Sequence, residues 1–428
     1  MKRSVVSISC AFTLALCLCY LRVFRTRTFS VGKASLSRQV HTPIKRLRTT
    51  CGVMTTILEV NDAVTYIAEN LNISLVVVGD KKTDHTEWSS FQQRHSDVAV
   101  YLSPFEQKRL PFLIRDQIPW NHFGRKSLGF MYAIAGGCEQ IYDFDDDNHM
   151  KGNHSFDIAV GWKLKNLKLK QNSLHVFNPY PYFQPTQNSF IWPRGFPLQF
   201  IRDRRTYDLE STDSIEVCDG EDDSSRLAVV QSLADHDPDV DAIYRMTRPL
   251  PMYFERNDTI LVLPRALYTP WNAQAVLVRK SAFFGLLLPV TVTGRVSDIW
   301  RSYVTSRLLW ETRYQIGFSS SFVTQYRNPH SYMVDFTDEH DLYNKVDDLL
   351  TALASWSSHG FDTLEEAYLN MISKLVFEAG ILGVADLRLA KAWVLDLKSV
   401  GYVWPEIHVR LNPMTLSTSD IVDQRHLG

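Results

Sequence analysis

Acidic side chains gather directly after one short apolar segment. The run Ile-Tyr-Asp-Phe-Asp-Asp-Asp-Asn begins at Ile141 and ends at Asn148. Carboxylates packed this closely repel one another, so one of them must bind a proton or a cation must lie between them. Oxygen ligands suit hard divalent cations such as Mg²⁺ and Mn²⁺. The alternative is a solvated acidic turn, because Asp and Asn are common turn formers.

The elements that position these acids are predicted to form an α/β sheet. Apolar, β-branched segments predict strands over 51–60, 73–78 and 98–102, and helical patterns cover 62–70 and 121–135, with Asn121 as a cap. Strands that alternate with helices indicate a doubly wound sheet. Ligands bind beyond the carboxyl ends of the strands in such sheets, where both Asp80 and the acidic run would lie.

The rest of the chain is predicted to divide into further parts. Residues 1–21 carry an uncharged apolar run after a basic tip and predict a cytoplasmic tip and transmembrane signal-anchor, with a cleaved signal peptide as the alternative. Residues 22–50 are basic and Ser/Thr-rich, as in a linker. Residues 51–330 are predicted to form the domain that contains the α/β sheet, and residues 331–428 form a predicted helical subdomain.

Composition describes an ordinary globular protein. The chain has 428 residues, 45% of them hydrophobic and 22% charged, and its net charge of −1 gives no indication of a nucleic-acid partner. Outside the N-terminal apolar run, the cysteines are Cys51, Cys138 and Cys218. Their odd number leaves at least one free or bonded to another chain, and Cys51 is the candidate for an intermolecular bridge.

Nine short motifs are distributed over residues 51–408. They are Val78-Gly79-Asp80-Lys81-Lys82-Thr83, Phe123-Gly124-Arg125-Lys126-Ser127-Leu128-Gly129-Phe130, the acidic run, Arg194-Gly195-Phe196-Pro197, Asp237-Pro238-Asp239-Val240-Asp241, Leu288-Pro289-Val290, Arg307-Leu308-Leu309-Trp310-Glu311, Ala392-Trp393 and Gly401-Tyr402. Together they resemble the STELLO-like family of Golgi glycosyltransferases. The resemblance implies that residues 51–330 are the catalytic domain and that this domain has a GT-A-like fold, a Rossmann-type mixed sheet flanked by helices with an Asp-x-Asp metal motif.

The resemblance also implies a function. It implies transfer of a sugar from a nucleotide-sugar donor to a hydroxyl of a glycan or glycoconjugate acceptor, with Mn²⁺ or Mg²⁺ as cofactor. It further implies a single-pass type II membrane protein whose body lies in the Golgi lumen. The alternatives are a non-catalytic scaffold of the same fold, which assists assembly or trafficking of other Golgi enzymes, and a metal-dependent hydrolase of nucleotide diphosphates.

Metal ligands are assigned from the acidic run. Asp145 and Asp147 match the two ends of the Asp-x-Asp motif and are expected to bind the metal and the diphosphate. The frame that starts at Asp143 is the alternative, although Asp143 is expected to be structural. His330 is a candidate for a last metal ligand, and His149, beside the acidic run, competes with it.

Other residues are assigned to the donor and to proton transfer. Arg125 and Lys126 are expected to face the nucleotide phosphates, or else to form a solvated helix face. Asp80 is expected to contact ribose or base, or else to be a turn residue. Asp298 is expected to act as the general base near the start of a helix over 297–310. Its alternative role is stabilisation of the helix dipole.

Overall fold

The structure is a computed structural model, which describes residues 41–152, Phe156 and residues 162–169, 175–186, 190–209, 215–219, 223–327 and 330–413. The predicted signal-anchor of residues 1–21 lies outside this set. Among the described residues, no helix combines the length and the apolar character needed to cross a membrane. Contacts group the described residues from Thr42 onward into one compact unit.

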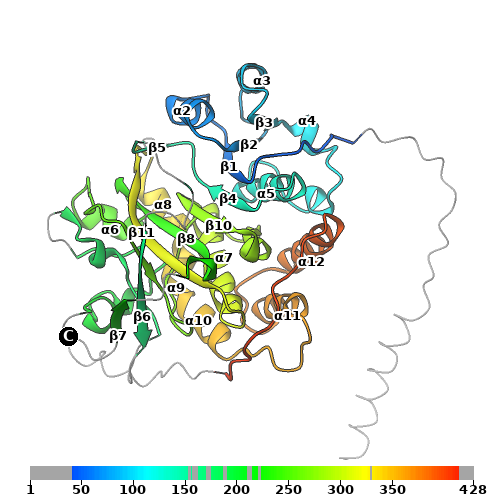
Figure 1. The fold of residues 1–428 in the computed structure, drawn as a ribbon. Helices are drawn as coiled ribbons and strands as arrows, with labels where there is room; N and C mark the ends of the chain where they lie inside the picture. The colour runs from blue at the N-terminus through cyan, green and yellow to red at the C-terminus, as the bar shows by residue number, and fades with distance from the viewer. Residues whose placement is uncertain are drawn as a thin grey trace, which may run out of the picture. The chain divides into compact units, whose positions relative to one another are not determined.

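A mixed β-sheet runs through this unit in the order β3-β2-β1-β4-β10-β8-β11-β9-β6-β7, with β5 paired to β11 (Figure 1). The strands are β1 (Thr50–Thr56), β2 (Ser74–Gly79), β3 (Ala99–Leu102), β4 (Gln140–Asp143), β5 (Asn148–Met150), β6 (Lys163–Leu169), β7 (Ile215–Asp219), β8 (Leu227–His236), β9 (Thr259–Val262), β10 (Val276–Arg279) and β11 (Gln315–Gln325). The predicted α/β sheet is confirmed in this mixed form.

Strand directions decide which ends meet. β1 pairs in parallel with both β2 and β4, and β2 pairs in parallel with β3. β10 is antiparallel to its neighbours β4 and β8, which therefore share one direction, and β11 is parallel to β8. The carboxyl ends of β1, β2, β3, β4, β8 and β11 consequently lie along the same edge of the sheet.

Helices flank the sheet. They are α2 (Asp62–Asn70), α3 (His85–Arg94), α4 (Pro104–Gln107), α5 (Lys126–Ala135), α6 (Ala242–Thr247), α7 (Gly294–Leu309), α8 (Tyr332–Asp338), α9 (His340–Asn344), α10 (Val346–Ala354), α11 (Leu364–Phe377) and α12 (Val384–Ser399), with the short 3₁₀ turns η1 (Leu113–Asp116), η2 (Phe123–Arg125) and η8 (Lys280–Leu286). α5 lies close against β1 and β2 because Gly129 has no side chain. A Cβ there would come within 2.8 Å of Val53 and 2.7 Å of Val78.

Two helix starts differ from the prediction. The side chain of His122, and not that of Asn121, caps the segment before α5, since its ring accepts a hydrogen bond from the Gly124 N–H at 2.9 Å. α7 begins at Gly294, earlier than predicted, so Asp298 lies in its second turn and not at its start. The alternative role of Asp298, stabilisation of the helix dipole, is therefore weakened, because the dipole effect falls off within the first turn of a helix.

The C-terminal helices α10 and α11 contact α7, and α12 packs against α11 and η1 (Figure 1). Their buried side chains belong to the same hydrophobic cluster as those of α5 and α7. The Asp396 carboxylate on α12 accepts hydrogen bonds from the Leu113 and Ile114 N–H groups of η1, at 2.8 and 2.9 Å. Both parts of the predicted domain division therefore share one core.

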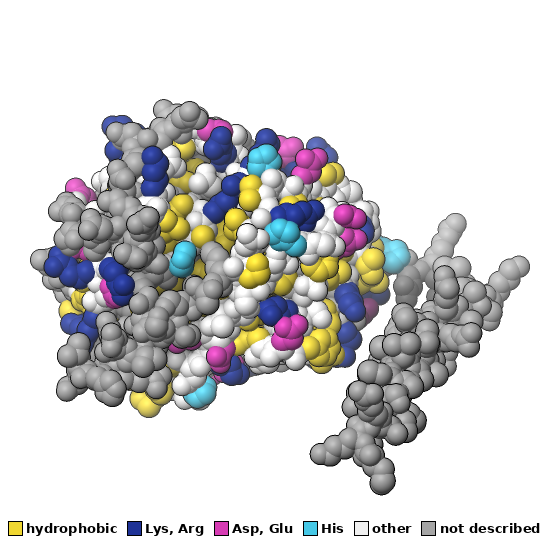
Figure 2. All heavy atoms as spheres, turned by 90° about the horizontal axis from the view of Figure 1, so that it is seen from below, with side chains coloured by type: hydrophobic (Ala, Val, Ile, Leu, Met, Phe, Trp, Pro, Cys, Tyr) yellow, Lys and Arg dark blue, Asp and Glu magenta, His cyan; other side chains and the backbone are white. Residues whose placement is uncertain are grey.

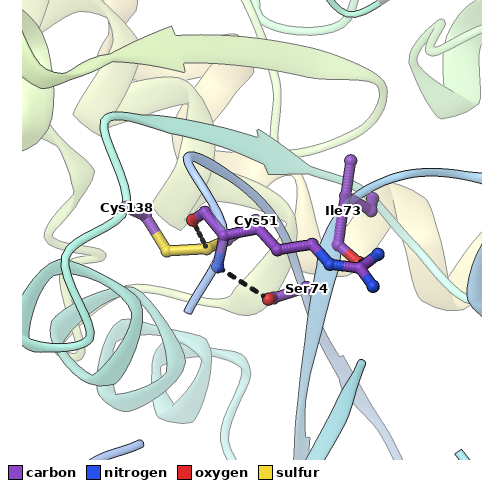
Figure 3. The surroundings of a disulfide bond; sticks show 5 residues. Cys51, Ile73, Ser74 and Cys138 are labelled. Carbon is purple, nitrogen blue, oxygen red and sulfur yellow. Dashed lines mark hydrogen bonds between the residues drawn. A yellow bond between two sulfur atoms is a disulfide. The ribbon is translucent and has the colours of Figure 1, made fainter. Parts of the chain in front are cut away.

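A disulfide joins Cys51 in β1 to Cys138, just before β4 (Figure 3). Next to it, the Arg48 N–H donates to Ser74 Oγ at 3.0 Å, which fixes the start of β1 beside β2. The expectation that Cys51 forms a bridge to another chain is wrong. Spacing along the sequence gave no sign that the amino ends of β1 and β4 would be neighbours, and this pairing brings the two cysteines together.

On the face of the molecule in Figure 2, Lys and Arg side chains alternate with Asp and Glu side chains, and hydrophobic side chains lie between them. This mixture agrees with a net charge of −1. The described part of this face therefore has no large patch of positive or of negative charge of the kind that attracts a highly charged polymer.

Candidate active site

A cleft of about 510 Å³ opens at the carboxyl edge of the sheet. The ends of β1, β2 and β4 and the segment before α5 form its walls. Its lining residues are Thr55, Thr56, Ile57, Leu58, Asp80, Lys82, Asn121, His122, Phe123, Asp145, Asp146 and Asp147. The cleft thus brings Asp80 together with the acidic run, as the order of strands predicted.

The turn after β4 is fixed from the β1 side. Thr56 Oγ1 donates to Asp146 Oδ2 at 2.5 Å, and Asn61 Nδ2 donates to the Asp146 carbonyl at 2.7 Å. The Asn148 side chain accepts a hydrogen bond from the Asp145 N–H at 3.1 Å. Asp146 is therefore occupied in shaping the turn, which leaves Asp145 and Asp147 as the carboxylates on either side of it.

Asp145 and Asp147 carry incompletely compensated charge. Burial raises the pKa of Asp145 to about 7 against the pull of Lys126, and Asp147 adds to the rise. The Asp145 side chain is still 37% exposed, so an incoming group can reach it. Gln325 Nε2 donates to Asp147 Oδ2 at 3.1 Å, whereas Asp147 Oδ1 is buried with no hydrogen-bond partner among the described residues.

These features fit a cation that is shared with a bound ligand. Among the described residues, no three His, Cys, Asp or Glu side chains come together as a complete ligand set. Mg²⁺ is commonly held by one or two carboxylates together with substrate phosphates and water. Asp145 and Asp147, with the unpartnered oxygen of Asp147, are the two residues that suit this arrangement.

Lys126 lies beneath the acidic run and does not face the cleft. Its side chain is fully buried, and its ammonium contacts Asp143 Oδ1 at 2.6 Å and the carbonyls of Phe144 and Ala273 at 2.7 and 3.0 Å. The ammonium also donates to Asp145 Oδ1 at 3.3 Å. The hydrogen bonds to Phe144, Ala273 and Asp145 use its three N–H groups, so the structure places Lys126 as a neutralising and positioning group rather than a free phosphate ligand.

Asp143 is held from both sides. Besides Lys126, the Arg301 guanidinium binds its second oxygen at 2.9 Å, and both side chains are buried. Arg301 also lies over the Trp271 ring, 4.8 Å from its centroid. This geometry supports the structural role expected for Asp143.

Arg125 points away from the cleft. Its guanidinium donates to Gln107 Oε1 and to the carbonyls of Arg115 and Ile118, and it lies 3.8 Å from the centroid of the Trp120 ring. Burial lowers the pKa of Arg125 to about 10. The structure therefore places it as a clamp on the loop that precedes α5, apart from Asp145 and Asp147.

Asp298 is also fully engaged. Arg194 donates to both of its oxygens, at 3.1 and 2.8 Å, and the N–H groups of Ala273 and Ile299 add two more hydrogen bonds. Arg194 in turn binds Asp239 at 2.8 Å. Burial opposes ionisation of Asp239, but Arg194 outweighs it and lowers the pKa of Asp239 to about 2. Asp298 thus belongs to a buried ion cluster and does not line the cleft.

The two histidines lie at different places. His330 Nε2 contacts Asp335 Oδ2 at 2.7 Å near the start of α8, and it is not among the cleft-lining residues. His149 lies in β5, two residues after Asp147, and its ring contacts Tyr326, with 5.2 Å between ring centroids. Of the two candidate histidine ligands, only His149 lies beside the acidic run.

Asp80 and Lys82 occupy the opposite wall of the cleft. Asp80 accepts hydrogen bonds from the N–H groups of Lys81 and His122, at 2.7 and 3.2 Å, and so ties the β2 loop to the segment before α5. Lys82 is an exposed cation at the cleft. Lys82 was not among the predicted site residues, although its position in a polar loop at the carboxyl end of a strand was a signal for such a role.

Comparisons with known proteins agree with the resemblance seen in the sequence. Residues 295–425 match the family described as STELLO glycosyltransferases. Probable glycosyltransferase STELLO2 of Arabidopsis thaliana is 32% identical over 327 residues, and Probable glycosyltransferase STELLO1 of the same plant is 31% identical over 324 residues. Each match covers 72% of this chain, and the chain spans 40% of the length of these curated relatives.

Among solved structures, S. aureus TarS 1–349 in complex with UDP-GlcNAc matches with a TM-score of 0.33 and 10% sequence identity, over 82% of this chain and 90% of that one. A similarity of this size carries no argument about the present site. The two plant relatives are more than 30% identical to this chain over 72% of its length, and the family model matches its C-terminal part. The chain therefore belongs to the STELLO-like family.

Proposed function

We propose that the chain is a glycosyltransferase that moves a sugar from a nucleotide-sugar donor to an acceptor hydroxyl. The observation that carries the proposal is the cleft at the carboxyl edge of the sheet, where Asp80 and Lys82 face Asp145 and Asp147. Ligand sites of open α/β sheets lie at this edge. A GT-A-like arrangement, with the donor between β1, β2 and β4, follows from the same placement.

In this proposal each wall of the cleft has a task. Asp80 orients the ribose or base, and Lys82 attracts the diphosphate. Asp145 and Asp147 hold Mn²⁺ or Mg²⁺, which supplies neutralisation of the charge on the leaving diphosphate. His330 and Arg125 were predicted to share these tasks. Their partners in the structure support other roles for both, a contact with α8 and a loop clamp.

The reaction exchanges one bond at the anomeric carbon. The acceptor oxygen bonds to that carbon, the bond between it and the diphosphate oxygen breaks, and the nucleoside diphosphate leaves with the electron pair. The acceptor hydroxyl gives its proton to a base. We assign Asp298 to holding Arg194 and not to this proton transfer, because both of its oxygens are already taken by hydrogen bonds.

We also propose that the body of the protein lies in the Golgi lumen, behind a type II signal-anchor in residues 1–21. The Cys51–Cys138 disulfide supports an oxidising compartment of the secretory pathway, since such bonds are rare in the cytosol. The acceptor would then be a glycan or glycoconjugate, and association with other Golgi enzymes would take place on the same side of the membrane.

A scaffold role is the second candidate. It is favoured by the burial of Arg125 and Lys126, which removes from the cleft the two cations that were expected to meet a diphosphate. A scaffold of this fold would keep the acidic turn as structure and would bind no nucleotide. A hydrolase would bind the donor and release free sugar without any acceptor.

Calorimetric titration of the full chain with UDP and with GDP, each with and without Mn²⁺, tests the proposal. We expect manganese-dependent binding of one nucleotide, weakened roughly tenfold or more in Asp145→Asn/Asp147→Asn. Asp97→Asn is the matched control, since that side chain is 78% exposed. Absence of binding by folded protein in every condition would count against the transferase and favour the scaffold role instead.

A further inference from the structure

A row of four aromatic rings, two exposed and two half-buried, begins beside the acidic run. Tyr253 contacts His236, His236 contacts Tyr326, and Tyr326 contacts His149, with 6.3, 4.8 and 5.2 Å between successive ring centroids. Tyr326 and Tyr253 are 54% and 42% exposed. We call these four side chains the aromatic row. Large aromatic side chains gathered in the open mark binding sites more often than single exposed ones do.

The backbone holds the row in place. The Tyr326 N–H donates to the Asp147 carbonyl at 3.2 Å, and β5, which contains His149, pairs with the end of β11. At the other end, His236 and Met252 exchange two backbone hydrogen bonds, of 2.6 and 2.9 Å. Four rings on four separate segments are thus fixed relative to Asp147; the two tyrosines are exposed and the two histidines are half-buried.

The row lies on the opposite side of the acidic run from the cleft. In the sheet, β4 separates β1 and β2, whose ends form the cleft, from β8 and β11, whose ends carry His236 and Tyr326. All of these carboxyl ends point to one edge. A donor in the cleft would therefore present its sugar over Asp145 and Asp147, toward a molecule that rests on the row.

We propose that the aromatic row binds the acceptor and that this acceptor is a neutral glycan; the assignment rests on the proposed transferase function. The C–H face of a pyranose ring is apolar and carries slight positive charge, which suits the negative face of an aromatic ring. Tyrosine hydroxyls and imidazole nitrogens at the same rings can exchange hydrogen bonds with sugar hydroxyls.

Neutral rather than charged sugars suit the surroundings of the row. Asp235, just before His236, is paired with Lys151, and Asp237, just after it, is paired with Arg245. Arg327, next to Tyr326, also faces Asp237, at 3.7 Å. Arg327 also lies near Asp239 and Asp147. Each of these cations therefore has a carboxylate of the protein beside it, and an anionic sugar would have to compete with that carboxylate.

Saturation-transfer NMR of the full chain measures this binding directly. The probes are neutral hexasaccharides of glucose, xylose, mannose and galactose, with a hexamer of galacturonic acid as the anionic comparison. We expect binding of at least one neutral probe, weakened roughly fivefold or more by Tyr326→Ala and by Tyr253→Ala, and nearly unchanged in Tyr326→Phe, which keeps the ring. Phe377→Ala, at a 66% exposed ring on α11, is the control and should have no effect.

The outcomes separate this inference from the proposed function. Binding of no neutral probe, binding that survives both alanine variants, or preference for the anionic hexamer would overturn the inference, while nucleotide binding would still support a transferase. Neutral glycan binding at the row without any nucleotide binding would uphold the row as a sugar site and contradict the transferase proposal. Far-ultraviolet circular dichroism of the same variants checks that each remains folded.

Discussion

At the scale of residues, two lysines use their charge differently around one acidic run. Lys126 is buried under it and bound to Asp143, whereas Lys82 is exposed at the cleft. In the sequence the pair Arg125-Lys126 suggested two free cations. Their partners are set by packing: α5 lies against β1 and β2, so its start is enclosed and its cations must find buried acceptors.

Substitution separates these two roles. Lys126→Met leaves buried Asp143 and its neighbour Asp145 short of one cation, and we expect a loss of about 3–5 kcal/mol in the free energy of unfolding. Lys82→Ala should leave stability unchanged and weaken nucleotide binding roughly fivefold or more. Urea unfolding and calorimetry measure the two effects. Lys391→Met, at an exposed position of α12, is the control.

Two results would contradict this division of roles. Unfolding of the Lys126→Met variant at the wild-type urea concentration would mean that the ammonium is dispensable for Asp143. Unchanged nucleotide affinity in Lys82→Ala would remove this lysine from the donor site and leave the diphosphate without a cationic side chain from the described lining of the cleft.

At the scale of elements, the disulfide joins β1, whose carboxyl end lines the cleft, to the segment just before β4, which is followed by the acidic run. Cys51 and Cys138 are 87 residues apart, so the bond closes a long loop of the unfolded chain. Closing a loop of this length is expected to stabilise the fold by about 2–5 kcal/mol. The enclosed loop contains β2, β3 and α5, all of which contribute to the cleft or support it.

Reduction therefore should lower thermal stability, and the double variant Cys51→Ser/Cys138→Ser should match the reduced wild type. Calorimetric unfolding with and without a reductant tests this. The double variant is its own control, since the reductant should leave its unfolding temperature unchanged. A reductant that lowers the unfolding temperature of the double variant equally would show that the effect arises elsewhere.

Helices and strands could be predicted from the sequence where neighbouring residues carried a clear hydrophobic pattern or end signal. The buried strands β1 and β2, the helix α2 with its Asn61 cap, and the acidic turn after β4 all follow from periodicity and end signals. α3 was missed because its ten residues are mostly polar and bury only Trp88 and Phe91. Lys126 and Asp298 have partners far along the chain, Ala273 and Arg194, which local patterns do not specify. The partners of Arg125 lie within the preceding segment of the chain, but their polar groups gave no sign that they would bind this side chain.

At the scale of the whole molecule, the C-terminal helices complete the surroundings of α7. Arg307 on α7 pairs with Glu311 at 2.6 Å, and both side chains are buried. Arg307 also donates to the carbonyls of Leu353 and Trp356, at 3.1 and 2.9 Å, and Ser358 Oγ donates to Glu311 at 2.7 Å. A buried ion pair of the predicted catalytic domain is thus satisfied by the predicted helical subdomain.

Removal of residues 331–428 should for this reason unfold more than the helices that it deletes. It would leave Arg307 and Glu311 without these partners and expose the apolar face of α7, at a cost of several kcal/mol. We expect residues 42–330 alone to lack a cooperative urea transition and to bind a hydrophobic dye, as loosely packed states do. The full chain should unfold in one transition when followed by both tryptophan fluorescence and far-ultraviolet circular dichroism. A cooperative transition of the shortened chain would instead establish a domain boundary near residue 330, and α7 would then have to satisfy its ion pair alone.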